Sequence, residues 1–225
     1  MQFSTAVTYP RPFRQPPAAP MRWEGLSVCL SKWGESQARW AQRCFSDGQR
    51  LGLEPMLLRF SAREPDLSSE EEGERREAIG MFSEALGLAE QIGVPQVCVT
   101  PGGEVWDDED DRQARLTALL RSLNELWKRA SQKGRDLLLE VPMPGHLGES
   151  PEELETILRL VDADLGLCYD VTATDVPENL RQAVRHVRVA VADESEMTRL
   201  EADLEHVLAG WYNGVVTVES MMARG

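Results

Sequence analysis

The sequence predicts a parallel (β/α)₈ TIM barrel, and three observations lead to that fold class. Eight short apolar segments with the composition of β-strands recur along the 225 residues. Amphipathic helical segments stand between most of them, which is typical of parallel βαβ units. The nucleotide-binding patterns GxGxxG and GxxxxGK[ST] follow none of the strands, which disfavours the competing open, doubly wound sheet. We therefore expect a single barrel domain over residues 1–225.

The strands are expected where apolar and β-branched runs are bounded by turn residues. They cover residues 2–8, 25–30, 55–60, 94–100, 136–141, 165–170, 186–193 and 214–220. The segment 136–141 hardly alternates between polar and apolar residues, as expected of a strand that is buried on both faces. This pattern favours a parallel sheet that is covered by helices.

Helices are expected where apolar residues recur at helical spacing. They cover residues 35–51, about 70–92, 111–132, a segment that starts at Ser150, about 177–185 and about 196–209. Ser69 with Glu72 has the pattern of a capping box, and Ser150 followed by Pro151 predicts a second helix start.

The chain is shorter than the roughly 250 residues that are typical of this fold, and the shortage falls at two places. Five prolines between Pro10 and Pro20 predict a link in place of the first helix. The sequence stops five residues after the last predicted strand, so we expect the closing helix to be missing too. Such a barrel should expose apolar strand faces, and we expect a homo-oligomer or a partner subunit to cover them.

The composition excludes several classes of protein. The chain has 24 Lys and Arg against 38 Asp and Glu, a net charge of −14, which disfavours binding to nucleic acid or to an anionic membrane surface. It has no apolar run long enough to span a bilayer and no secretory signal at its start. Four scattered cysteines have neither metal-site nor disulfide spacing. We expect a reduced, cytoplasmic protein.

Three carboxylates stand at the ends of predicted strands. Glu140 ends the fifth strand, Asp170 the sixth and Glu219 the eighth. Active sites of barrels lie at the carboxyl ends of the strands, so these three side chains should converge on one mouth. The alternative is that strand ends carry polar residues simply because the chain returns to water there.

The stretches REAIGMFSEALGLAEQIGVPQVCVTPGG, LLLEVP, LGLCYD, HVRVAVADES and YNGVVTVES resemble the xylose isomerase-like TIM barrels, over about residues 75–220. This family includes sugar phosphate isomerases and epimerases and endonuclease IV-like enzymes. The resemblance implies that Glu140, Asp170 and Glu219 bind a divalent metal, and that the two glutamates act as acid and base. The expected substrate is a small sugar or sugar phosphate.

The sequence departs from this family at two metal-binding histidines. The position three residues after Asp170 is Ala173, and the histidine of the seventh strand is replaced by Ala190 or, in a shifted alignment, by Arg188. Two interpretations remain open. Three carboxylates could hold Mn²⁺ or Mg²⁺. Alternatively, Arg188 faces the barrel axis and replaces the metal, which leaves a catalytically degenerate barrel for ligand binding or assembly.

Further substrate contacts are expected around the mouth. His146 lies in the loop after the fifth strand and Trp106 in the loop after the fourth, while Arg59 stands near the end of the third strand. Each also has a simpler interpretation: an exposed loop histidine, part of a solvated acidic loop, and an ion-pair partner for an acid. An abasic-site endonuclease is disfavoured, because the chain lacks several metal-binding histidines and a basic groove.

Overall fold

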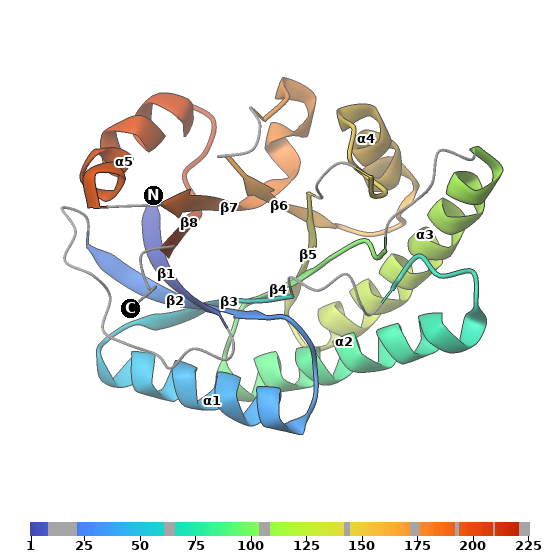
Figure 1. The fold of residues 1–225 in the computed structure, drawn as a ribbon, viewed down its shortest axis with the longest axis horizontal. Coiled ribbons are helices and arrows are strands. Elements are labelled where there is room, and N and C mark those ends of the chain that lie inside the picture. Colours follow the sequence, from blue (N-terminus) through green and yellow to red (C-terminus); the bar gives the residue numbers. More distant parts are fainter. Residues whose placement is uncertain are drawn as a thin grey trace.

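The computed structural model describes residues 1–8, 22–60, 66–103, 109–141, 145–171, 176–191, 194–208 and 210–220. Eight parallel strands close into a barrel in which each strand pairs with the next along the chain and β8 pairs with β1 (Figure 1). The strands are β1 (Gln2–Thr8), β2 (Trp23–Leu30), β3 (Glu54–Phe60), β4 (Gln96–Val99), β5 (Asp136–Glu140), β6 (Gly166–Asp170), β7 (Val184–Val191) and β8 (Val215–Ser220). The predicted barrel is confirmed, with every predicted strand present.

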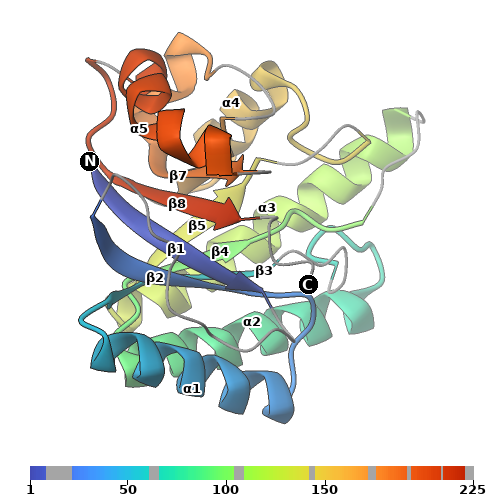
Figure 2. The same cartoon turned by 60° about the vertical axis from the view of Figure 1, so that its left-hand side comes forward.

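Helices line the outside of the strand ring, as the two views of the ribbon show (Figures 1 and 2). They are α1 (Glu35–Arg50), α2 (Glu72–Ile92), α3 (Glu109–Gln132), α4 (Pro151–Leu160) and α5 (Glu194–Leu208). The helix expected at about 177–185 is a shorter 3₁₀ turn, η1 (Glu178–Ala183). No helix in the described part of the chain is long and apolar enough to cross a membrane.

The two predicted helix starts had different outcomes. Ser150 is the N-cap of α4, and its side chain accepts a hydrogen bond from the Glu153 N–H at 3.1 Å. The capping box of Ser69 with Glu72 is wrong, because α2 begins at Glu72 itself. The Ser69 hydroxyl instead accepts from the Glu71 N–H and donates to the carboxylate of Glu74, in the first turn of α2.

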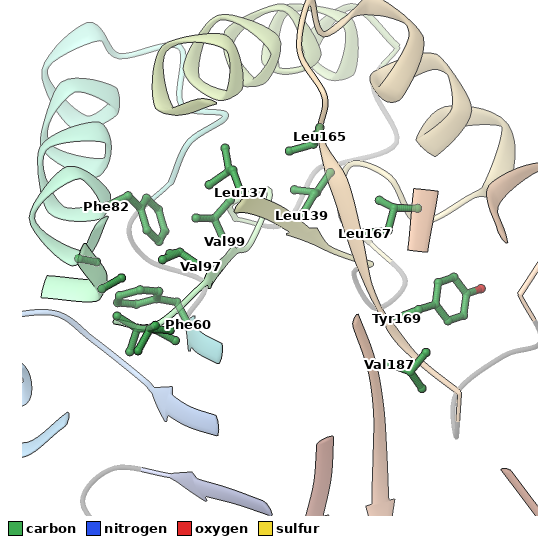
Figure 3. Packing of buried hydrophobic residues seen from close by; sticks show 14 of the residues in the cluster. Phe60, Phe82, Val97, Val99, Leu137, Leu139, Leu165, Leu167, Tyr169 and Val187 are labelled. Atoms are coloured by element: carbon green, nitrogen blue, oxygen red, sulfur yellow. The ribbon is translucent and has the colours of Figure 1, made fainter. Parts of the chain in front are cut away.

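The main apolar core fills the space between the strands and the helices. Figure 3 shows part of it, where side chains of β3 to β7 meet α2 and its neighbours. Phe60 and Phe82 pack edge to face there, with ring centroids 5.0 Å apart. These outward-facing strand residues alternate with residues that face the barrel axis, which is the period of two expected of strands.

The expected exposure of apolar strand faces is wrong for the residues that the structure describes. Phe3 of β1 and Val216 and Val218 of β8 belong to the main core and are buried. The exposed large apolar residues in the described ranges, Met1, Leu51, Leu160 and Val207, come from separate parts of the chain. The Pro-rich link, residues 9–21, and residues 221–225 lie outside the described residues, so the two missing helices stay predictions.

A layer of side chains fills the barrel axis. One half of this layer is apolar, and the other half is polar and hydrogen-bonded. On the β3 to β6 side, Leu57, Cys98, Leu138 and Cys168 form a small separate core cluster. On the other side, buried polar residues of β1, β2, β7 and β8 form a chain of hydrogen bonds. Its members are Ser4, Ser27, Thr217, His186 and, from β4, Gln96.

Candidate functional site

A charged layer lies directly above this interior layer, toward the carboxyl ends of the strands. Because side chains alternate along a strand, the residue two positions after an inward-facing residue also faces inward. This rule places Arg59 above Leu57 and Glu140 above Leu138. It likewise places Asp170 above Cys168, Arg188 above His186 and Glu219 above Thr217. Five charged side chains from five strands therefore share one level at the mouth of the barrel.

Arg59 of β3 binds two of the three carboxylates. Its guanidinium group contacts Glu140 as a fork, with Nε 3.1 Å from Oε2 and Nη2 2.8 Å from Oε1. Nη1 donates to Glu219 Oε1 at 2.6 Å and lies 3.5 Å from the Cys29 sulfur. Paired planar contacts of this kind are the strong form of an arginine–carboxylate interaction. Arg59 thus joins β3 to β5 and β8.

Arg188 of β7 contacts all three carboxylates. Its Nη2 donates to Asp170 Oδ2 at 2.8 Å, and its Nη1 lies 3.1 Å from Glu140 Oε1 and 3.3 Å from Glu219 Oε1. Its Nε is buried and has no hydrogen-bond partner among the described residues. The prediction that Arg188 faces the axis and reaches these carboxylates therefore agrees with the geometry, although a second arginine, Arg59, shares the task.

The two arginines are more deeply buried than two of the acids. The side chains of Arg59 and Arg188 are 9% and 8% exposed, against 26% and 28% for Asp170 and Glu219. Burial lowers the pKa of Arg59, but the negative charges around it, that of Glu140 first, more than reverse this effect and raise the pKa overall. Burial raises the pKa of Glu140, against the opposing charge of Arg59. A guanidinium group stays charged at any physiological pH, so the site contains two permanent cations.

These side chains, as arranged, do not fit a divalent metal ion. Both oxygens of Glu140 accept hydrogen bonds from Arg59, and Arg188 lies among the three carboxylates, where a shared cation would have to bind. Among the described residues, no group of three or more His, Cys, Asp and Glu side chains is arranged to hold a metal. The position of Ala190 adds no ligand, and Ala173 lies outside the described residues.

A chain of hydrogen bonds lies one layer beneath the site and includes His186 and Thr217, on the strands that carry Arg188 and Glu219. Thr217 binds the Ser27 hydroxyl at 2.8 Å and His186 Nε2 at 2.6 Å, and His186 Nδ1 lies 2.8 Å from Gln96 Oε1. Burial, aided by the charge of Arg59, lowers the pKa of His186 to about 3. His186 is therefore a neutral structural residue, and both of its ring nitrogens are hydrogen-bonded. Arg188 and Glu219 of the charged layer stand two positions after His186 and Thr217.

Two predicted substrate contacts remain, His146 and Trp106. His146 is buried rather than exposed. Arg112 of α3 donates to its backbone oxygen and to the carboxylates of Glu149 and Glu153. These contacts fix the loop between β5 and α4 against α3. Trp106 lies in residues 104–108, outside the described residues.

Sequence reasoning gave Arg59 too small a role. It was expected either to contact an anionic substrate or to pair with an acid, and it binds two acids and the Cys29 sulfur. A signal was present in the sequence. Arg59 interrupts the apolar strand Pro-Met-Leu-Leu-Arg-Phe, and its neighbours Leu58 and Phe60 belong to the outer core, so it must face the axis.

Residues 22–209 match the family described as xylose isomerase-like TIM barrel. The chain belongs to this family. The match covers most of the chain, including the strands that carry four of the five charged residues, and it confirms the resemblance drawn from the sequence. No curated protein sequence matches this member of the family.

Solved structures share the fold at low sequence identity. A 3-keto-D-glucoside 4-epimerase from E. coli has a TM-score of 0.71 at 14% identity, with 90% of this chain and 84% of that chain covered. A D-psicose 3-epimerase with D-tagatose, from Clostridium cellulolyticum, has a TM-score of 0.66 at 16% identity over 97% and 84%. An AP endonuclease, family 2, from Brucella melitensis has a TM-score of 0.67 at 16% identity over 96% and 92%. At these identities the likeness establishes the barrel fold.

Proposed function

We propose that this barrel binds a small carbohydrate at its mouth without a divalent metal, and that Arg59 and Arg188 replace the metal as the cations of the site. The proposal rests on the contacts of both arginines with Glu140. Both of its oxygens accept hydrogen bonds from Arg59, while Arg188 lies 3.1 Å from Oε1. A metal ion would have to approach this carboxylate against two guanidinium charges that already contact it.

Carbohydrate is the ligand class that the rest of the site supports. Two of the similar structures are sugar epimerases by name. The carboxylates of Asp170 and Glu219 are partly exposed, and carboxylates at a pocket mouth are strong acceptors for hydroxyl groups. A barrel mouth lined by fixed polar groups is also the usual place for a small ligand in this fold.

The same geometry argues against the metal-assisted isomerase that the family resemblance implies. In that mechanism Glu140 and Glu219 would move protons next to a carbonyl group that is polarised by the metal. Here the proton-accepting oxygens of Glu140 are occupied by permanent cations, and Glu219 Oε1 accepts from both arginines. We therefore propose ligand binding, and not isomerisation, as the function of the mouth.

Metal analysis tests the proposal directly. The protein is purified without chelator, its metal content is measured by mass spectrometry, and Mn²⁺ is then titrated into stripped protein while the melting temperature is followed. We expect no stoichiometric divalent ion and no shift of the melting temperature with Mn²⁺. One tightly bound ion per chain that is lost in Glu140→Gln would overturn the proposal and restore the metal-assisted isomerase.

A further inference from the structure

The first two turns of α3 carry two arginines, Arg112 and Arg115, that contact loops of the neighbouring βα units. α3 lies between α2 and α4 around the barrel (Figure 1). Arg115 contacts the loop that follows β3, and Arg112 contacts the loop that follows β5. Because the loops that follow the strands of a barrel lie at its mouth, both arginines contact the rim of the candidate site. The rim is here residues 66–69, 102–103 and 145–149.

Arg112 fixes the loop after β5 through two carboxylates. Its Nε and Nη2 donate to Glu153 as a fork, at 2.9 and 2.7 Å, and Nη2 also lies 3.0 Å from Glu149 Oε1. The same carboxylates accept hydrogen bonds from the loop backbone. The Gly145 N–H donates to Glu149 and the Gly148 N–H donates to Glu153, each at 2.6 Å. One guanidinium group thus orients two side chains that in turn bind the backbone of the loop.

Arg115 fixes the loop after β3 through Asp66. Its Nη1 donates to Asp66 Oδ2 at 2.9 Å and to the Ser68 hydroxyl at 3.1 Å. Asp66 Oδ1 accepts from the Ser68 N–H and from the Ser68 hydroxyl, at 2.8 and 2.7 Å. Further along α3, the Ser122 hydroxyl donates to the Leu67 backbone oxygen at 2.8 Å. The loop after β3 is therefore bound to α3 through both its side chains and its backbone.

The loop after β4 packs against the same aspartate. A Cβ added at Gly102 would lie 2.0 Å from Asp66 Oδ1, and one added at Gly103 would lie 3.2 Å from Asp66 Oδ2. Glycine at these positions lets the backbone approach the carboxylate closely. Three successive loops of the mouth are thus joined to α3, either directly or through Asp66.

The charged layer fixes the strand ends of two of these loops. Arg59 is the next-to-last residue of β3 and Glu140 is the last residue of β5, and Arg59 binds Glu140 as a fork. The loops after β3 and β5 are therefore held by one ion pair where they leave the strands. They are held a second time by Arg115 and Arg112, close to the helices that follow.

We propose that Arg112 and Arg115 are positioning residues of the site, which keep the rim in one conformation before a ligand arrives. A preformed rim spares the ligand the entropy cost of ordering loops when it binds. This inference rests on the proposed function and deepens it, because it assigns to α3 the residues that prepare the mouth for a small carbohydrate. Its first measurement needs no ligand, so that the two proposals can fail separately.

Amide hydrogen exchange of the full chain measures the effect of each arginine on the rim. In Arg112→Met we expect residues 145–149 to exchange at least about tenfold faster, while residues 66–69 keep the wild-type rate. Arg115→Met should show the opposite pattern. The matched control is Arg129→Met, which removes an arginine near the other end of α3 that contacts Glu125 and Ser83. It should leave both loops unchanged.

Calorimetry then measures the consequence for binding. D-Glucose, D-galactose, D-mannose and D-ribose are screened against the wild-type chain, and the tightest of the four is used with the variants, below their melting transitions. Because ordering the backbone of one freed residue weakens binding about tenfold, we expect the Kd to rise by at least this factor in Arg112→Met and in Arg115→Met. The Kd should be unchanged in Arg129→Met. A merely structural role would lower the melting temperature and leave the Kd of the folded protein unchanged.

Arg112→Lys and Arg115→Lys keep the charge but replace the planar guanidinium group by a single ammonium group. They give the same test, with smaller changes, if a methionine variant does not fold. Unchanged exchange in both loops would overturn the inference. Faster exchange with an unchanged Kd would also overturn it, and carbohydrate binding would stand. If none of the four sugars binds the wild-type chain, the proposed function fails, and the exchange rates alone decide whether the arginines position the rim.

Discussion

Replacing Arg188 by methionine should destabilise the barrel strongly at neutral pH. The substitution keeps an unbranched side chain but removes a guanidinium group that is 8% exposed and contacts three carboxylates at 2.8, 3.1 and 3.3 Å. Removing one partner of a buried ion pair costs about 3–5 kcal/mol, because the remaining charge is buried without compensation. For a chain of this size that corresponds to a fall of about 10 °C in the melting temperature.

The pH dependence separates a charge effect from a loss of packing. Without Arg188, three carboxylates share one cation, so their pKa values in the folded variant rise above those in the unfolded chain. The free-energy deficit of the variant is therefore fully present above the folded pKa values and shrinks as the pH falls and the carboxylates take up protons. A deficit caused by lost packing would be the same at pH 7 and pH 4.5.

Chemical denaturation at these two pH values measures both effects. The control is Arg76→Met. This arginine forms an ion pair with Glu72 in which the two side chains are 75% and 54% exposed. Such surface pairs contribute at most about 1 kcal/mol. The reasoning about the charged layer is refuted if Arg188→Met costs no more than Arg76→Met at pH 7, or if its cost does not decrease at pH 4.5.

Three further predictions concern the residues around the site. Gly102→Ala should destabilise the protein by about 2 kcal/mol or more. Gly102 has a φ of 131°, and an added Cβ would lie 2.0 Å from Asp66 Oδ1. Thermal unfolding measures the loss of stability, and an unchanged melting temperature would contradict the prediction. The neutral His186, with a pKa of about 3, should contribute stability at pH values above 6.5 that is lost as the pH falls toward 3, at about 1.4 kcal/mol per pH unit. Denaturation of His186→Gln across this range should show a correspondingly flatter profile, and an unchanged slope would count against the assignment. Ser150→Ala should cost about 1 kcal/mol through loss of the hydrogen bond from the Glu153 N–H, measured by urea unfolding, and no loss would mean that the cap is dispensable.

The sequence by itself determined that the chain forms a barrel and that the site lies at the carboxyl ends of its strands. Apolar runs and helix signals located every strand, and parallel strands necessarily bring their carboxyl ends to one mouth. Convergence of Glu140, Asp170 and Glu219 followed from their positions at strand ends, and the inward direction of Arg188 followed from the alternation of β7. These features depend on local periodicity, which a single sequence carries in full.

The tertiary structure decided which charges meet. Arg59 is separated from Glu140 and Glu219 by 81 and 160 residues, and their contacts depend on the register around a closed ring and on the reach of a long side chain. The hydrogen bond from Arg112 of α3 to the backbone oxygen of His146 likewise joins two separate elements. Local patterns carry no information about such contacts, because their energies arise only when residues far apart in the chain share one buried, low-dielectric space.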